Sequence, residues 1–263
     1  MPNASLINSL LAGMIAGLAS GFLGVSPGGI LVPVITLLLP FSQHVAQGVS
    51  LVVQAPPTSV SSLAAYSRKG NRVAILPVLL VSLGFIAGGP IGAILARACS
   101  ERELRWMFVG YLLILTALSL LKRSRSNTPA AGAQPERHRP YASVILVGIG
   151  IVAGMSSGLL GIGGGLAVTA LSVILLRKRQ HEAQALSLAV TALPLTLPAA
   201  WVYVHQGLDL PWRAIVWLIV GLIVGGWTGA VFATRLPEKK LKLAFTVVLV
   251  AMASYMIVRA MRS

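Results

Sequence analysis

The stretch "AGMSSGLLGIGGGLAV", Ala153 to Val168, decides the fold class, because glycines interrupt a hydrophobic segment of membrane length. Glycine is a poor helix residue, and a backbone group without a hydrogen-bond partner is costly in lipid. A similar stretch, "AGLASGFLGVSPGGILV", runs from Ala16 to Val32. Both stretches predict a helix that breaks inside an apolar segment, where protein or water must satisfy the freed backbone groups.

The composition is that of a membrane protein: 56% of the 263 residues are hydrophobic and only 10% are charged, whereas a soluble domain has about 25% charged residues. Stretches that hold at most one charged residue and are near the roughly 20 residues that cross a bilayer recur. They are Ser5–Gly24, Val45–Tyr66, Val73–Ala96, Leu104–Leu121, Ser143–Gly161, Ala183–Tyr203, Ala214–Ala233 and Leu241–Val258. Two shorter runs, Gly28–Leu39 and Gly165–Leu176, reach only about 18 Å. We therefore expect an all-α polytopic protein with about 8–10 membrane segments.

The charge pattern favours a membrane orientation over a nucleic-acid partner. The net charge is +15, and the basic residues gather in short loops such as "SRKGNR" (67–72) and "RKRQ" (177–180), as in cytoplasmic loops. Cys99 is the only cysteine, which excludes a disulfide framework within the chain and a cysteine metal cluster. The N-terminus lacks the basic region of a cleaved signal peptide, so Ser5–Gly24 is expected to be retained. Paired carboxylates, a nucleophile–base set and metal ligands are missing from the apolar segments, so no catalytic residue, metal or cofactor is expected.

The chain contains an internal duplication. A shift of 137 positions aligns the two halves without a gap and places Gly24 on Gly161, Gly28 on Gly165, and Pro57 on Pro194. Such self-similarity indicates a repeat architecture. The expected organisation is a first membrane repeat over 1–122, a basic cytoplasmic linker over 123–140, and a second membrane repeat over 141–263.

Loop charges indicate that the two repeats are inverted relative to each other. "PFSQHV" in the first half is uncharged, whereas its counterpart "LRKRQHE" is basic. The next loop reverses this pattern, with "SRKGNR" in the first half and "VHQGLD" in the second. Because basic loops stay in the cytoplasm, equivalent loops are expected on opposite sides and both termini outside. Each half is expected to hold a glycine-broken helical hairpin and three transmembrane helices, the hairpin either crossing fully or re-entering.

Inverted repeats with interrupted helices are typical of secondary transporters. A break exposes amide groups at the positive end of the next half-helix, which attracts an anion, and glycine lets a ligand approach the backbone. We favour this function for Gly161 and Gly163–Gly165. The alternative, close helix packing through small residues, is favoured for six other glycines: Gly84, Gly88, Gly92, Gly221, Gly225 and Gly229.

Polar residues also recur in both halves. Histidine, glutamine and serine lie three residues apart, on roughly one helical face, at His44, Gln47 and Ser50 and at His181, Gln184 and Ser187. Helix capping is favoured for the histidines. For glutamine and serine, lining a cavity and bonding between helices are both open. Pro57 and Pro194 are expected to kink their segments, with Thr58 or Thr196 bonding the freed carbonyls. Aromatic residues near segment ends are interpreted as interfacial anchors: Tyr66, Trp106, Tyr203 and Trp212.

The motifs "GLLGIGGGLAV" and "GFLGVSPGGILVP", with "GGPIGA" and "GGWTGA", resemble the TauE/SafE (TSUP) family of sulfite-exporter-like membrane proteins. The first copy departs from the glycine triplet, having Ser26 and Pro27 where the second has Gly163 and Gly164. The resemblance implies a cytoplasmic-membrane transporter of small anions, typically sulfite, sulfonates or related organic acids.

The sequence therefore predicts a secondary transporter in the cell inner membrane that exports a small anion by alternating access. Its expected partners are the anion and the lipid bilayer, with no nucleic acid; a homo-oligomer is left open. Ion-coupled anion uptake and a non-transporting membrane scaffold are the alternatives. The residues expected to bind the substrate are Gly24, Ser26, Gly28, Gly29, Gln47, Ser50, Gly161, Gly163, Gly164, Gly165, Gln184 and Ser187.

Overall fold

The computed structural model describes residues 2–23, 26–56, 74–121, 140–176, 178, 180–205, 207–233 and 238–261. This part of the chain is all-helical, as expected, with eleven helices. They are α1 (Pro2–Leu23), α2 (Gly28–Leu38), α3 (Gln43–Val53), α5 (Ile75–Ala98), α6 (Glu101–Leu121), α7 (Pro140–Leu160), α8 (Gly165–Leu175), α9 (Gln180–Thr191), α10 (Leu197–His205), α11 (Trp212–Ala233) and α12 (Glu238–Met261). Three described stretches are long and apolar enough to cross a membrane: Ile75–Ala98, Ser143–Leu160 and Trp212–Gly229.

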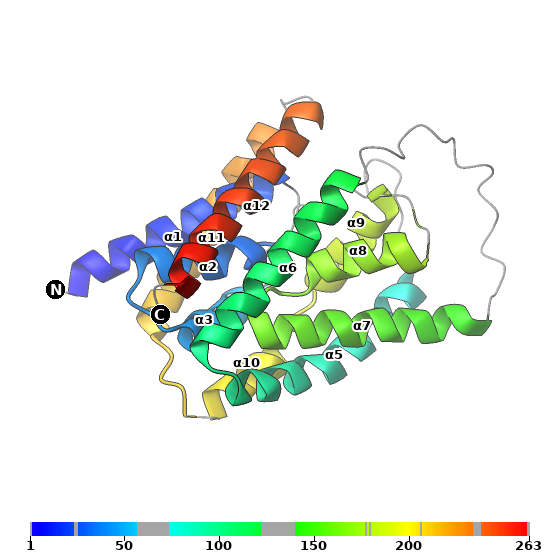
Figure 1. The fold of residues 1–263 in the computed structure, drawn as a ribbon, viewed down its shortest axis with the longest axis horizontal. Coiled ribbons are helices and arrows are strands. Elements are labelled where there is room, and N and C mark those ends of the chain that lie inside the picture. The colour runs from blue at the N-terminus through cyan, green and yellow to red at the C-terminus, as the bar shows by residue number, and fades with distance from the viewer. Residues whose placement is uncertain are drawn as a thin grey trace.

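The helices of the two halves pair reciprocally. α1 packs along α11, and α7, the sequence counterpart of α1, packs along α5, the counterpart of α11. α6 packs against its own counterpart, α12. In Figure 1, α1 and α7 start at opposite ends of the longest axis and run toward its centre. The glycine-rich stretches at the ends of these two helices are thereby brought to the middle of the molecule.

Glycines hold the two long helix pairs in backbone contact. A Cβ added at Gly84 of α5 would lie 2.2 Å from the carbonyl oxygen of Val147 of α7, and one at Gly221 of α11 would lie 2.3 Å from that of Leu10 of α1. Lipid tails are as apolar as the side chains of the helices, so burial of apolar surface does not by itself hold two membrane helices together. Small residues let the two backbones approach closely, and the resulting van der Waals packing stabilises the pair. The packing interpretation is confirmed for Gly84, Gly88, Gly92, Gly221, Gly225 and Gly229.

The expected span Ala183–Tyr203 is wrong as a single helix. α9 ends at Thr191 and α10 begins only at Leu197, so the chain is interrupted around Pro194 and not merely kinked. Pro194 and Pro198 supply no amide donor, and each disfavours the helical conformation in the residue before it. The expected role of Thr196 is also wrong, because its buried hydroxyl has no hydrogen-bond partner among the described residues.

The corresponding span of the first half, Val45–Tyr66, is described only in part. α3 covers its beginning and ends at Val53, and a turn follows as far as Pro56. Ser42 caps the start of α3, where its hydroxyl accepts a 3.3 Å hydrogen bond from the amide of Val45. Pro57 and Thr58, and therefore their expected kink, lie outside the described residues.

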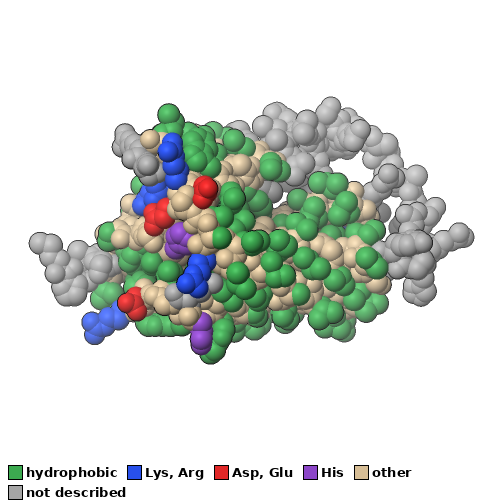
Figure 2. Space-filling view, turned by 60° about the horizontal axis from the view of Figure 1, so that its bottom comes forward, with side chains coloured by type: hydrophobic (Ala, Val, Ile, Leu, Met, Phe, Trp, Pro, Cys, Tyr) green, Lys and Arg blue, Asp and Glu red, His purple; other side chains and the backbone are tan. Residues whose placement is uncertain are grey.

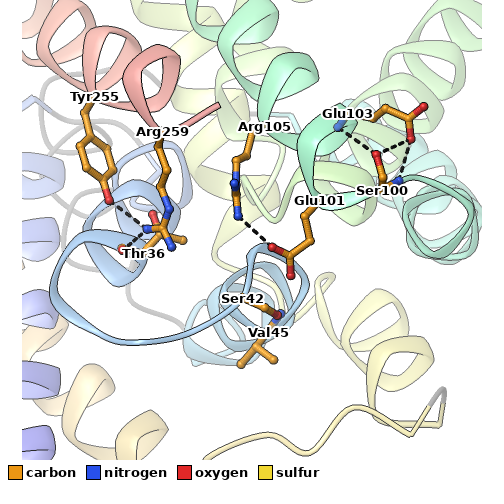
Figure 3. A network of polar contacts seen from close by, with 9 residues as sticks. All are labelled: Thr36, Ser42, Val45, Ser100, Glu101, Glu103, Arg105, Tyr255 and Arg259. Atoms are coloured by element: carbon orange, nitrogen blue, oxygen red, sulfur yellow. Dashed lines mark hydrogen bonds and ion pairs between the residues drawn. The ribbon is translucent and has the colours of Figure 1, made fainter. Parts of the chain in front are cut away.

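Several helix ends meet on one side of the molecule. Nε2 of His44 at the start of α3 lies 3.1 Å from the carbonyl oxygen of Ala96 near the end of α5. Arg259 at the end of α12 donates to the carbonyl oxygen of Thr36 near the end of α2 (Figure 3). We call this side the charged face; it contains Arg97, Glu101, Arg102, Glu103, Arg105, Asp209, Arg213 and Arg259. Figure 2 shows charged side chains gathered at one end of the molecule, beside a largely hydrophobic surface.

A capping box starts α6 on this face. The amide of Ser100 donates to Oε2 of Glu103 over 2.7 Å, and the amide of Glu103 approaches the hydroxyl of Ser100 at 3.3 Å (Figure 3). These hydrogen bonds from Ser100 favour the ionised carboxylate and lower the pKa of Glu103. One turn further on, Arg105 forms a 2.8 Å ion pair with Glu101. These hydrogen bonds and the ion pair stabilise the first turns of α6, which packs beside α3 and α12.

Candidate functional site

The predicted break in the second half is present. α7 ends at Leu160 and α8 begins at Gly165, and between them Gly161, Gly163 and Gly164 have φ angles of 71°, 75° and 66°. Side chains with a Cβ rarely adopt these left-handed conformations, so the break requires glycine. The first half is broken as well, because α1 ends at Leu23 and α2 begins at Gly28. Gly24 lies outside the described residues.

The two breaks lie against each other. A Cβ added at Gly28 would lie 2.2 Å from the carbonyl oxygen of Ile162, and one at Gly29 would lie 3.2 Å from Cδ1 of Leu166. A Cβ at Gly163 would lie 3.0 Å from the hydroxyl oxygen of Ser26. Residues from two segments far apart in the sequence therefore form a single site.

Polar side chains of α3 bind the backbone of the second break. The hydroxyl of Ser50 donates to the carbonyl oxygen of Gly161 over 2.7 Å, and Nε2 of Gln54 donates to the same oxygen over 3.2 Å. Gln54 also accepts a 3.2 Å hydrogen bond from the hydroxyl of Ser26 in the first break. All three side chains are buried. Gln54 thus connects the two breaks directly.

In the second half, α9 supplies the equivalent contact. The buried hydroxyl of Ser187 donates to the carbonyl oxygen of Gly165 over 2.6 Å. Thr169, one turn into α8, donates to the same oxygen over 3.0 Å. Gln184 is partly buried on α9. The serines of the two polar rows therefore both hold the backbone of the second break.

Tyr203 is not an interfacial anchor, which corrects the sequence interpretation. Its side chain is 1% exposed, and its hydroxyl lies 2.9 Å from the carbonyl oxygen of Gly158 and 3.2 Å from Oε1 of Gln47. α10 packs against α3 and α5, and this turns Tyr203 inward while Trp201 faces outward. Trp106 and Trp212 are 43% and 58% exposed. Tyr66 lies outside the described residues.

The histidines do not line the cavity in the described part of the chain. His44 can donate to the carbonyl oxygen of Ala96 in the last turn of α5, so it satisfies the end of a neighbouring helix and does not cap its own. The side chain of His181 lies outside the described residues.

A small cavity lies where the breaks meet. Its volume is about 10 Å³, close to the roughly 10–15 Å³ that holds one water molecule. Its polar lining consists of Ser26, Gln54, Thr191 and Thr196, beside the backbone of Gly163. The hydroxyl of Thr196 is buried and has no partner among the described residues, so it is available to a solute in the cavity.

Backbone amides add further donors at this point. Within the described residues, no hydrogen bond has the amide of Gly163, Gly164 or Gly165 as its donor. These groups lie at the start of α8, where the helix dipole is positive. Amides and hydroxyls of this kind can donate to an oxyanion. The described residues contain no group of three His, Cys, Asp or Glu side chains that could hold a metal ion.

The sequence matches the sulfite exporter TauE/SafE family over residues 9–256, which includes both breaks. The chain belongs to this family. It is 28% identical over 98% of its length to a "Probable membrane transporter protein" of Xylella fastidiosa, strain Temecula1, of which 97% is covered. It is also 28% identical to YdhB of Bacillus subtilis and 26% identical to YunE of the same organism, both described as probable membrane transporter proteins. These alignments cover 89% and 96% of the chain, and 93% and 97% of the relatives.

Membership of the TauE/SafE family makes the chain a multi-pass membrane transporter and not an enzyme. The resemblance found in the sequence is therefore confirmed. Within this TauE/SafE chain the two halves contribute unequally to the site. Gln54 and Ser26 of the first half correspond to Thr191 and Gly163 of the second, so the first half carries the larger polar side chains.

Sequence reasoning missed Gln54, Thr191 and the cavity-lining role of Thr196 in this TauE/SafE transporter. Gln54 had a detectable signal, because it continues the row of Gln47 and Ser50 on the same face of an apolar helix. The sequence shift then places Thr191 on Gln54. No comparable signal distinguished Thr196, which enters the site only because the segment between α9 and α10 turns back toward Ser26.

Proposed function

We propose that the chain is a secondary transporter that exports a small anion through the cavity between the two breaks. The observation that carries the proposal is the convergence of both breaks on buried donors: the amides at the start of α8 and the hydroxyl of Thr196. Sulfite, an organosulfonate or a related acid presents oxygen acceptors that match these donors. The substrate-binding set is Gly24, Ser26, Gly28, Gly29, Gln47, Ser50, Gly161, Gly163, Gly164, Gly165, Gln184 and Ser187, to which we add Gln54 and Thr196.

We further propose that residues 1–122 and 141–263 are inverted repeats joined by the linker 123–140. The reciprocal pairs α1–α11 and α7–α5 support this relation, because the first helix of each half packs on the equivalent helix of the other half, α11 or α5. The opposite starting points of α1 and α7 support it as well (Figure 1). A symmetric pair of breaks around one site is the usual basis of alternating access in transporters.

The proposed orientation places the charged face outside the cell. Of the chain's 21 Lys and Arg residues, the described part of this face holds only Arg97, Arg102, Arg105, Arg213 and Arg259. In the sequence, the basic runs adjoin the start of α5, the end of α6, the end of α8 and the start of α12. Because basic loops stay in the cytoplasm, both termini are placed outside.

The size of the cavity supports a transport cycle that alternates between states. A space of about 10 Å³ is too small for an anion with several heavy atoms, so the proposed cycle includes a state in which this space is wider. Entry of the anion requires the two halves to separate around Gln54 and Ser26. An inside-negative potential favours anion exit by about 2.3 kcal/mol per charge per 100 mV, so export needs no coupling ion.

The proposal is tested by flux measurements in proteoliposomes loaded with sulfite, thiosulfate, taurine or acetate. We expect efflux of at least one anion, accelerated by an inside-negative potential. Empty liposomes and liposomes that contain the Gly163→Leu/Gly164→Leu double variant serve as controls, and both should show no flux above leak. Absence of flux for every anion contradicts transport, and influx that requires a co-ion contradicts export.

A further inference from the structure

We infer that a row of polar side chains on α3 forms the solute path between the charged face and the cavity, and that Tyr203 is the gate on this path. The inference rests on the proposed transport function. It adds a route and a gate to the proposed site.

The row consists of Gln43, Gln47, Ser50 and Gln54. Their spacings of four, three and four residues place them on one face of α3, with Gln54 directly after its last residue, over about 16 Å along the helix axis. All four are buried. Gln43 is the first residue of α3, beside the charged face, and Gln54 lines the cavity. The row therefore joins the two places that an exported anion must connect.

The outer half of the row has unused hydrogen-bonding capacity. Both polar atoms of the Gln43 side chain, and Nε2 of Gln47, are buried without a partner among the described residues. Buried polar groups almost always have a partner, so these three atoms are the ones on this helical face that a solute could bind. The unpaired atom of Gln47 is a donor, which suits an anion. Ser50 and Gln54, at the inner half, are engaged with Gly161.

Tyr203 lies across this row at its middle. Its hydroxyl reaches Gln47 on α3 and Gly158 on α7, and a Cβ added at Gly48 would lie 3.4 Å from the ring. The side chain thus contacts the row at Gln47, which lies between Gln43 and Ser50 in the sequence of the helix. Tyr203 belongs to α10, a nine-residue helix that follows the interruption around Pro194, so α10 can shift without bending a long helix.

The second half repeats the pattern in its sequence. Gln180, Gln184, Ser187 and Thr191 have the same spacing on α9, and Tyr66 is the sequence counterpart of Tyr203. α9 begins next to the basic run 177–179, whereas α3 begins at the charged face. The sequence therefore repeats the residue types of the row beside the basic run 177–179, on the other side of the proposed symmetry.

The path is tested by cysteine labelling with an anionic methanethiosulfonate reagent in a Cys99→Ser background. The reporters are Gln43→Cys outside the gate, Ser50→Cys inside it, and Val49→Cys, which faces the apolar core, as the matched control. Labelling is measured in intact cells and in inverted vesicles, so that the result does not depend on the proposed orientation. Each reporter is combined with Tyr203, Tyr203→Phe and Tyr203→Ala.

We expect Gln43→Cys to react at the same rate in all three backgrounds, because it lies outside the gate. Ser50→Cys should react at least tenfold faster with Tyr203→Ala than with Tyr203, and about threefold faster with Tyr203→Phe, which keeps the ring but loses both hydroxyl contacts. If Tyr203→Ala does not insert, Tyr203→Phe alone carries the comparison. Val49→Cys should stay unreactive throughout.

The inference is overturned if Ser50→Cys reacts at the same rate in every background, or if Val49→Cys accelerates equally, because that indicates general loosening. Anion flux of the unsubstituted chain is measured separately. If anion flux is present but labelling of Ser50→Cys does not depend on Tyr203, the path is contradicted and the proposed transport stands. If labelling depends on Tyr203 but no anion flux is found, the proposed transport is contradicted.

Discussion

The helix α7 and the break that follows it use glycine in two different ways. Gly150, Gly154 and Gly158 are helical, and a Cβ at each would lie 2.0–2.4 Å from a carbonyl oxygen of α5. Gly161, Gly163 and Gly164 have positive φ angles, and a Cβ on them would meet Gln47, Gln54 and Phe85, respectively. The helical glycines require only a small side chain, whereas the break requires both a left-handed backbone and space. The spacing of the glycines in the sequence does not distinguish these two roles, but the effects of replacing each glycine are expected to differ.

The largest effect is expected at Gly163, where a left-handed backbone coincides with contact to both Gln54 and Ser26 of the first half. A Cβ there would lie 2.0 Å from Oε1 of Gln54. Gly163→Ala should lower anion flux per inserted molecule about 100-fold, because the strain of φ > 0 and the steric overlap together amount to about 3 kcal/mol. Flux is measured in proteoliposomes containing equal amounts of folded protein.

Gly207 provides the matched control for this prediction. Its φ angle is 79°, close to that of Gly163, but a Cβ there meets nothing within 4 Å. Gly207→Ala should therefore lower stability by about 1–2 kcal/mol through backbone strain alone and leave flux per folded molecule unchanged. Equal losses of flux in both variants would show that the break has no special role in transport.

The next effect concerns stability and not transport. Gly150→Ala places a Cβ 2.1 Å from the carbonyl oxygen of Val81, so α5 and α7 must separate, at about 1–3 kcal/mol. Gly148 on the same helix has open space around it, and Gly148→Ala should be neutral or stabilising by up to about 1 kcal/mol. Thermal unfolding in detergent measures both. A similar shift for the two variants would contradict the packing role of Gly150.

A smaller effect on the site is expected from Gln54→Met, which keeps the side-chain volume but removes the hydrogen bonds that connect the breaks. The apparent KM for the anion should rise roughly tenfold, since the net loss of such bonds is about 1–2 kcal/mol. Flux measured against anion concentration gives this value. An unchanged KM would show that Gln54 does not organise the donors.

The smallest effect is expected from Ser187→Ala. Ser187 holds the break through one hydrogen bond, to Gly165, and Thr169 donates to the same oxygen. Losing one of two bonds should raise KM about two- to threefold, since a net hydrogen bond contributes about 1 kcal/mol and Thr169 compensates in part. A change as large as that for Gln54→Met would contradict the unequal roles of the two halves.

The sequence predicted features that depend on local backbone chemistry. The glycine triplet predicted the second break, and the spacing of Gly84, Gly88 and Gly92 predicted close helix packing, because in both cases the missing side chain is itself the cause. The interpretation of Tyr203 as an interfacial anchor was wrong because an aromatic residue near the end of a segment can face either the membrane interface or the protein interior. Only the packing of α10 turns its side chain inward. Pro194 predicted a bend, but the further effect of Pro198 made it a full interruption.

The central claim, that the breaks form the transport site, is tested most directly by a reversible cross-link across the cavity, from the first break to the end of α9. Ser26 of the first break and Thr191 of α9 both approach the position that a Cβ on Gly165 would take, at 2.8 Å and 3.2 Å. Ser26→Cys/Thr191→Cys in a Cys99→Ser background should form a link on oxidation, lose anion flux, and regain it on reduction. Continued flux through the cross-linked protein, or failure of the two cysteines to react with each other, would contradict the account.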